Sequence, residues 1–189
     1  MAIIGLFAVL ALYEWFSICF SSEKSPLCKI SWLVIGSTYI AAGCYAFWLI
    51  DVYAYHALLS ISLLISIFAY DIGAYFVGST LGGPKLCPAI SPAKTWSGFI
   101  GGTTLCTMTV YFLLEIYDPS YSPAGTIASG LIVSVLAQAG DLLESWTKRS
   151  FNIKDSGHLI PGHGGVLDRI DSCLMVSIAV ALYIYVLGL

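Results

Sequence analysis

Charged side chains are scarce in this sequence of 189 residues: Asp, Glu, Lys and Arg together make up 10% of it, and hydrophobic residues make up 58%. Soluble domains carry charge at roughly a quarter of their positions. The scarcity therefore excludes a soluble core with a charged surface, and the mean hydropathy of +0.87 indicates an integral membrane protein. We expect the lipid bilayer as a partner and no nucleic acid.

Paired cysteines are also lacking. None of the six cysteines forms a Cys-x-x-Cys motif, and most of them fall in apolar runs. This pattern argues against a disulfide framework or a cysteine metal site, so we expect buried free thiols. Low-complexity tracts and clear internal repeats are missing as well. The sequence predicts one membrane domain over residues 1–189.

Long apolar runs are what the sequence does contain. Six of them can each cross a bilayer as a helix of about 20 residues, and they cover residues 1–20, 30–50, 55–78, 98–116, 124–139 and 172–189. The first lacks a basic start and a small-residue cleavage site, so we interpret it as a retained helix, not a signal peptide. The expected fold is an all-α polytopic bundle of about six transmembrane helices with two functional cytoplasmic loops.

The positive charges fix an orientation for these spans. Every Lys and Arg lies in the connecting segments 21–29, 79–97 and 140–171, which alternate to one side of the membrane. The positive-inside rule makes that side cytoplasmic and places both termini on the other side. The active site is therefore expected on the cytoplasmic face.

Charge of both signs is concentrated in residues 141–171, which hold nine of the nineteen charged residues. Asp141, Glu144, Ser145 and Lys148 follow i, i+3, i+4, i+7 spacing, so on a helix they share one face. One interpretation is an interfacial helix with a Glu144–Lys148 pair worth a few tenths of a kcal/mol. That pair leaves the rest of the stripe unexplained, so we favour a site for metal ions and phosphates.

Two further acids precede the last span. Asp168 and Asp171 can simply favour a helix N-terminus. However, one loop joins the last two spans and can bring Asp168 close to Asp141. Carboxylate oxygens that face each other suit Mg²⁺, so we expect a magnesium site at Asp141 and Asp168.

The segment 161–165, Pro-Gly-His-Gly-Gly, predicts a tight turn. Glycines such as Gly164 and Gly165 let backbone N–H groups approach an anion closely. His163 can bond a phosphate, serve as an acid or cap the following turn, and the sequence leaves these roles open.

The second cytoplasmic loop offers matching groups. Asp71 lies near the cytoplasmic end of the third span, where an acid is a functional candidate. Lys94 and the hydroxyls of Ser91 and Thr95 can receive a phosphate, although a lone lysine beside the membrane usually faces lipid headgroups. Glycines at 98, 101 and 102 predict close helix packing.

These residues together resemble a known family, the phosphatidate cytidylyltransferases (CDP-diacylglycerol synthases). The resemblance runs from about residue 60 to the C-terminus and is carried by Ser145-x-x-Lys148-Arg149-x4-Lys154-Asp155-x5-Pro161-x-His163-Gly164-Gly165-x-x-Asp168-Arg169-x-Asp171. Two upstream segments also look like that family's: Asp71-x-Gly73-Ala74-Tyr75 and Ile90-Ser91-Pro92-x-Lys94-Thr95. Members usually carry additional N-terminal helices, so the resemblance implies a short member.

The resemblance implies transfer of CMP from CTP to phosphatidic acid, giving CDP-diacylglycerol and pyrophosphate, in phospholipid biosynthesis. It implies Mg²⁺, with K⁺ in some members, held at Asp141 and Asp168. It also implies a place in the bacterial inner membrane, and a homodimer is compatible with so small a bundle. The remaining roles that it implies are nucleotide and phosphate binding by Asp71, Ser145, Lys148, Arg149 and Lys154, and support of the metal by Arg169 and Asp171.

Other functions fit the sequence less well than this one, with one exception. An ion-coupled transporter would carry charge across the membrane, but here the charge gathers on one face. A CDP-alcohol phosphatidyltransferase would need an Asp-Gly-x-x-Ala-Arg motif, which the sequence lacks. A cytidylyltransferase for another membrane lipid phosphate remains the main alternative.

Overall fold

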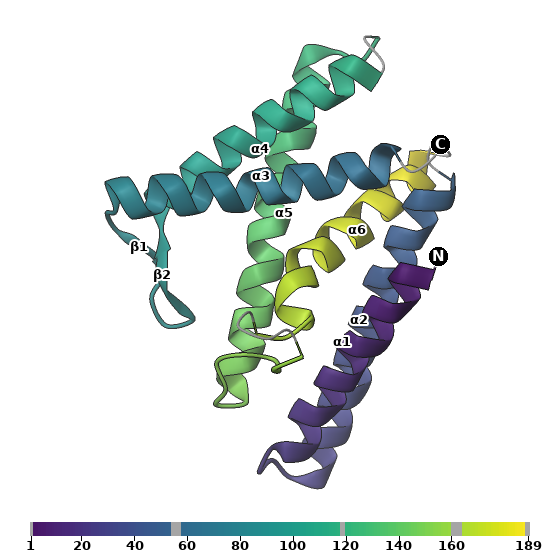
Figure 1. Cartoon of the computed structure of the whole chain (residues 1–189), viewed down its shortest axis with the longest axis vertical. Coiled ribbons are helices and arrows are strands. Elements are labelled where there is room, and N and C mark those ends of the chain that lie inside the picture. The colour runs from purple at the N-terminus through teal and green to yellow at the C-terminus, as the bar shows by residue number, and fades with distance from the viewer. Residues whose placement is uncertain (1, 54–57, 118–119, 160–163, 188–189) are drawn as a thin grey trace.

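Six helices dominate the computed structural model, which describes residues 2–53, 58–117, 120–159 and 164–187 (Figure 1). Each is long and apolar enough to span a membrane, which confirms the predicted polytopic all-α fold. The elements in chain order are α1 (Ala2–Ser21), α2 (Pro26–Tyr53), α3 (Leu58–Leu81), β1 (Lys85–Cys87), β2 (Ser91–Thr95), α4 (Trp96–Tyr117), α5 (Pro123–Ser150) and α6 (Leu167–Leu187).

The apolar runs form helices because a bilayer offers no partners for backbone N–H and C=O groups, which a helix satisfies internally. Large side chains such as Ile3, Phe68, Ile72 and Phe112 point outward, as lipid-facing residues do. Two buried clusters hold the helices together: the first contains Ile50, Leu63, Ile67, Tyr70, Cys106, Val110, Ala137 and Val176, and the second Ala11, Trp15, Cys19, Ile40, Phe151, Leu167 and Leu174. All six cysteines are free thiols as predicted, but only Cys19 and Cys106 are buried and the other four are partly exposed.

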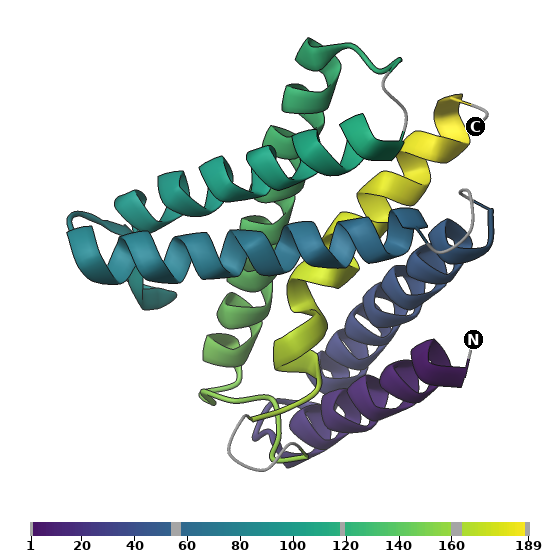
Figure 2. The ribbon, with the colours of Figure 1, turned by 45° about the horizontal axis from the view of Figure 1, so that its top comes forward.

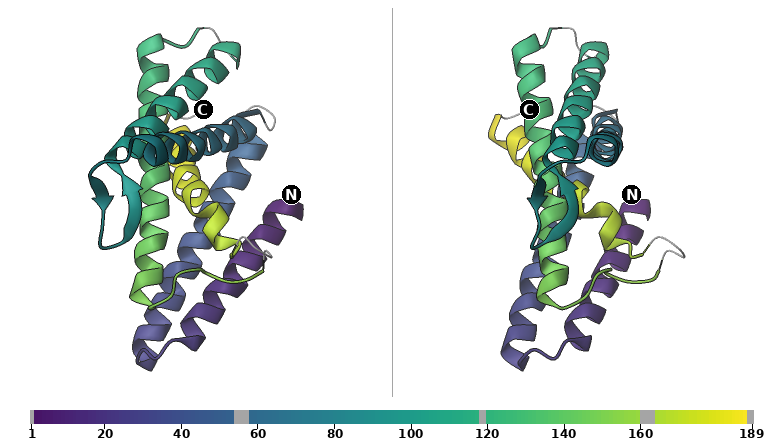
Figure 3. Two further views of the ribbon diagram at one scale, coloured as in Figure 1. Left: turned by 60° about the vertical axis from the view of Figure 1, so that its left-hand side comes forward. Right: turned by 90° about the vertical axis from the view of Figure 1, so that its left-hand side faces the viewer.

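Two helix pairs, α1–α2 and α3–α4, pack against the central helices α5 and α6. Helices α1 and α2 run antiparallel, and α6 packs between α2 and α5 (Figures 1 and 2). Helices α3 and α4 pair with each other and cross α5 at a steep angle (Figures 1 and 3). In Figure 1 the strands β1 and β2 lie below α3, and the α1–α2 connection and the described parts of 151–166 lie near the bottom.

Helix α5 is longer than the predicted span, which ended at residue 139, because the charged stripe continues the same helix to Ser150. It begins with Ser122, whose Oγ accepts the Gly125 N–H at 3.1 Å, a typical N-cap. Two residues after its last residue, Ser150, the chain turns at Asn152, which has a φ of 57°. The Asn152 and Ile153 N–H groups return to the Arg149 and Lys148 carbonyls at 3.0 Å each, which closes the helix with a Schellman motif.

A short antiparallel hairpin, β1–β2, replaces the loop that the sequence predicts before α4. Its second strand leads directly into α4, and the Thr95 Oγ1 accepts the Gly98 N–H at 3.1 Å. Thr95 is therefore the N-cap of α4, and it is buried. In this structure its hydroxyl, a predicted phosphate ligand, instead caps the helix.

The α3–α4 contact depends on glycine, as the sequence predicts. A Cβ atom at Gly98 would lie 2.8 Å from the Ala74 carbonyl oxygen and 3.3 Å from the Gly78 Cα. At Gly102 it would lie 2.8 Å from the Tyr70 carbonyl oxygen. Only glycine lets the two backbones approach this closely.

We therefore expect Gly98→Ala to destabilise the protein by about 1–3 kcal/mol, because the added methyl group meets a backbone atom that cannot move alone. The measurement is the midpoint of thermal unfolding in detergent. Gly5→Ala is the matched control, since a Cβ there meets nothing within 4 Å, and alanine favours a helix by about 1 kcal/mol. Equal midpoints for the two variants would contradict this view of the α3–α4 contact.

Candidate active site

The charged stripe predicted on one helix face is present on the last turns of α5. The Ser145 Oγ donates to the Asp141 Oδ1 at 3.3 Å, and Lys148 forms an ion pair with Glu144. Both pairs are four residues apart, so the spacing predicted this geometry. The Glu144–Lys148 pair alone would fit a simple interfacial helix, but in the structure Lys148 has a second partner.

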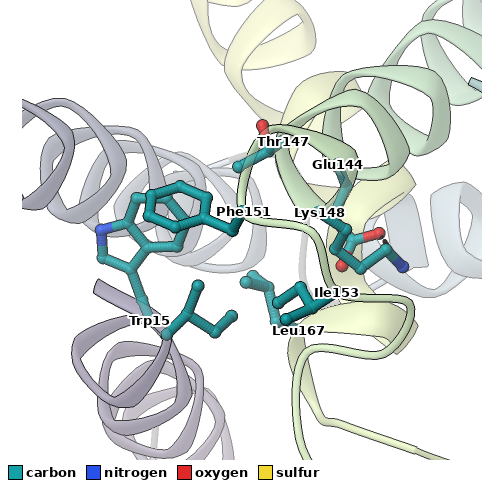
Figure 4. Close-up of a pocket in the computed structure, with 8 residues that line it drawn as sticks. Trp15, Glu144, Thr147, Lys148, Phe151, Ile153 and Leu167 are labelled. Carbon is teal, nitrogen blue, oxygen red and sulfur yellow. Dashed lines mark ion pairs between the residues drawn. The ribbon is translucent and has the colours of Figure 1, made fainter. Parts of the chain in front are cut away.

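That partner is Asp168 of α6, whose Oδ1 lies 2.7 Å from the Lys148 Nζ. Lys148 therefore bridges a carboxylate on its own helix and one on the next. The side chains of Glu144 and Asp168 are each 9% exposed. Figure 4 shows a small pocket with Glu144 and Lys148 on one side and Trp15 and Phe151 on the other.

The backbone also holds Asp168. The Ser156 N–H donates to its Oδ2 at 3.1 Å, and the Gly165 N–H donates to the same oxygen at 2.9 Å. Gly164 has a φ of 85°, and a Cβ there would lie 3.0 Å from that oxygen. The glycines of the predicted phosphate loop thus approach a carboxylate of the chain itself in this structure.

The hairpin brings the second predicted loop to the site. Lys94, on β2, forms an ion pair with Asp141. Arg149 donates its Nε to the Ile90 carbonyl oxygen at 3.3 Å and its Nη1 to the Ile153 carbonyl oxygen at 3.1 Å. These contacts fasten the hairpin to the end of α5 and place Lys94 over the charged stripe.

Asp141 also lies near two other predicted acids. Asp71 on α3 and Asp171 on α6 each interact electrostatically with Asp141 and with each other. Close packing of α5 and α6 explains part of this, because a Cβ at Gly140 would lie 2.8 Å from the Asp171 carbonyl oxygen. The Ser172 Oγ, which donates to the Ala137 carbonyl oxygen at 3.0 Å, fixes the same contact.

The other predicted residues lie around this centre in different ways. Arg169 is exposed and interacts electrostatically with Asp71. Lys154 is exposed on the segment after α5 and forms no ion pair with another described residue. Ser91 begins β2 beside the Ile90 carbonyl group that binds Arg149. His163 lies outside the described residues.

The two acids predicted to hold Mg²⁺, Asp141 and Asp168, each offer carboxylate oxygens of the kind that this ion prefers. Mg²⁺ is usually held by one or two carboxylates and by substrate phosphates, not by a complete protein cage. Within the described ranges, no group of three or more His, Cys, Asp or Glu residues is arranged to hold a metal. Asp141 and Asp168 are the carboxylates whose oxygens now bind the ammonium groups of Lys94 and Lys148.

Sequence reasoning missed Glu14 altogether. It lies on α1 and is 2% exposed, and its carboxylate accepts hydrogen bonds from residues 156, 166 and 167. One signal was available, because Glu14 is the only charged residue between positions 2 and 21. An ionisable residue inside a span is a functional candidate by default.

Comparisons with known proteins identify relatives of this chain. The chain is 48% identical to the phosphatidate cytidylyltransferase of Brucella melitensis over 119 residues, 63% of this chain and 43% of that protein. It is 45% identical to that of Rickettsia bellii over 117 residues (59% and 51%), and 47% identical to that of Bacillus subtilis over 112 residues (58% and 41%). The chain thus matches about half or less of the length of these relatives. The model of the cytidylyltransferase family matches residues 1–187, so the chain belongs to that family.

Proposed function

We propose that this chain transfers CMP from CTP to phosphatidic acid, giving CDP-diacylglycerol and pyrophosphate, at the cytoplasmic face of a bacterial inner membrane. The family membership and the names of the relatives support the reaction. The segregation of every Lys and Arg to one set of loops supports the orientation.

One observation carries the proposal most directly: two lysines are held by carboxylates at the ends of spanning helices. Lys94 binds Asp141, and Lys148 binds both Glu144 and Asp168. Cations fixed at this depth can meet a lipid phosphate from the membrane and a nucleotide from water at the same place. Arg149, Arg169 and Lys154 extend the positive charge toward the solvent.

The reaction needs charge neutralisation more than it needs a base. A phosphate oxygen of phosphatidic acid attacks the α-phosphorus of CTP, the bond to the β-phosphate oxygen breaks, and pyrophosphate leaves. A phosphate monoester has a second pKa near 6, so this nucleophile is largely ionised at pH 7. The principal barrier is the approach of two polyanions, which preorganised cations lower.

Mg²⁺ would be held by Asp141 and Asp168 and would supply further positive charge against the phosphates. With the metal bound, the Lys94 and Lys148 ammonium groups would share these carboxylate oxygens with it. The two lysines would then lie beside the phosphate oxygens, with Lys148 still paired with Glu144. The chemistry of the donors, all hard oxygens, supports Mg²⁺ over a softer metal.

The test uses CTP labelled on either its α- or its γ-phosphate, with purified protein, phosphatidic acid and Mg²⁺ in detergent. We expect the α-label in the lipid and the γ-label in pyrophosphate. A γ-labelled lipid would mean phosphoryl transfer and would contradict the proposal. Product formation from a polyprenyl phosphate and none from phosphatidic acid would overturn the assignment of the lipid substrate.

A further inference from the structure

Glu14 makes an unusual set of contacts for a residue in an apolar helix. Its Oε1 accepts the Val166 N–H at 2.9 Å, and its Oε2 accepts the Leu167 N–H at 2.9 Å and the Ser156 Oγ–H at 3.2 Å. All three partners lie about 140 or more residues further along the chain. Both oxygens of a buried carboxylate are therefore occupied by one distant segment.

The two backbone partners explain why an acid is required. Leu167 is the first residue of α6, so the Val166 and Leu167 N–H groups belong to the end of a helix where donors lack partners within the helix. That end also carries the positive end of the helix dipole, which favours a carboxylate. A cap normally comes from a neighbouring residue in sequence, but here α1 provides it to α6.

The same segment holds Asp168. Ser156 donates its hydroxyl to Glu14 and its N–H to Asp168. Gly165 donates its N–H to Asp168, and a Cβ at Gly165 would lie 2.6 Å from the Glu14 Oε2. A Cβ at Gly157 would lie 2.7 Å from the Glu14 Oε1. The chain is thus packed directly onto the Glu14 carboxylate on one side and binds Asp168 on the other.

We infer that Glu14 is a positioning residue for the active site: its carboxylate anchors residues 156 and 165–167 so that their N–H groups and the start of α6 hold Asp168 against Lys148. This inference rests on the proposed function for its catalytic consequence. The anchoring itself depends only on the contacts of Glu14.

Glu14→Gln tests the inference with the smallest change of shape. An amide oxygen can still accept one backbone N–H, but the amide NH₂ group is a donor and opposes the other N–H. We expect kcat to fall by about 10–100-fold, as for residues that orient a site without touching substrate, with the KM for CTP little changed. Hydrogen exchange at the Val166 and Leu167 amides should become faster, and exchange in α3 and α4 should not change.

Glu23→Gln is the matched control, because Glu23 is an exposed carboxylate beyond the end of α1. Wild-type kcat per folded molecule and wild-type exchange in Glu14→Gln would overturn the inference. If Glu14→Gln does not fold, Ser156→Ala removes only the hydroxyl bond, and unchanged kcat and exchange in that variant would overturn it equally. An inactive wild type would refute the proposed function alone, since the exchange experiment still decides whether Glu14 anchors the segment.

Discussion

Asp168→Asn is expected to lower kcat by about 10²–10³-fold, the scale seen when one electrostatic contact to a reacting centre is removed. The substitution keeps the shape of the side chain but removes the charge that holds Lys148. It also replaces one acceptor oxygen by an NH₂ donor. Because the Ser156 and Gly165 N–H groups both donate to Oδ2, the NH₂ group takes the place of Oδ1, the oxygen that accepts from Lys148. Steady-state kinetics with CTP and phosphatidic acid measure the effect.

Asp51→Asn is the matched control for this change. Asp51 lies at the far end of α2 and accepts the Ser60 Oγ–H at 2.8 Å, a bond that an amide oxygen also accepts. We expect this variant to keep wild-type kcat. Full activity of Asp168→Asn, in protein that unfolds at the wild-type midpoint, would remove Asp168 from the proposed site.

Lys148→Met is expected to have the largest effect on stability. Methionine fills a similar volume but leaves two carboxylates, each only 9% exposed, without their common cation. Breaking a buried ion pair from one side costs about 3–5 kcal/mol. At roughly 2–4 °C per kcal/mol for a chain of this size, the thermal midpoint should fall by about 6–20 °C.

A second substitution separates the contributions of the two carboxylates. Asp168 keeps its two backbone donors without Lys148. The partners of Glu144 are side chains, Lys148 and Asp168, so without Lys148 its carboxylate is left beside a second acid. Glu144→Gln in the Lys148→Met background should therefore recover most of the lost stability, because the unpaired buried charge is then removed. A double variant as unstable as Lys148→Met would contradict this division.

Local features of the sequence predicted much of the fold and part of the site. The apolar runs are long enough to be recognised singly, and the stripe from Asp141 to Lys148 follows from helix spacing alone. The glycines at 98, 101 and 102 likewise predicted close packing without naming the partner helix. Each of these inferences uses residues within a few turns of one another.

The missed features depend on contacts between distant segments. The hairpin has strands of three and five residues, too short for an alternating pattern to be distinguished from a loop. The pairing of Lys94 with Asp141 requires the hairpin to be docked on α5. The sequence could not predict that Glu14 caps a helix, because the helix that it caps begins at Leu167, 153 residues further along the chain.

The end of α5 was also misplaced when it was judged from hydropathy alone. Hydropathy falls where the charged residues begin, so a window for apolar residues stops near residue 139. The helix nevertheless continues to Ser150, because those charges face the hairpin and α6 and are neutralised there. The periodicity of residues 141–148 indicated the length of the helix. Hydropathy indicated only the apolar part of it that can lie within the membrane.

The most direct measurement is the formation of CDP-diacylglycerol by the purified protein from CTP and phosphatidic acid, with Mg²⁺ and with Mg²⁺ removed by a chelator. We predict product with Mg²⁺ and none after chelation, with activity restored when the ion is returned. No product at any Mg²⁺ concentration, from protein shown to be folded, would contradict the proposed function, and undiminished product after chelation would contradict the magnesium site.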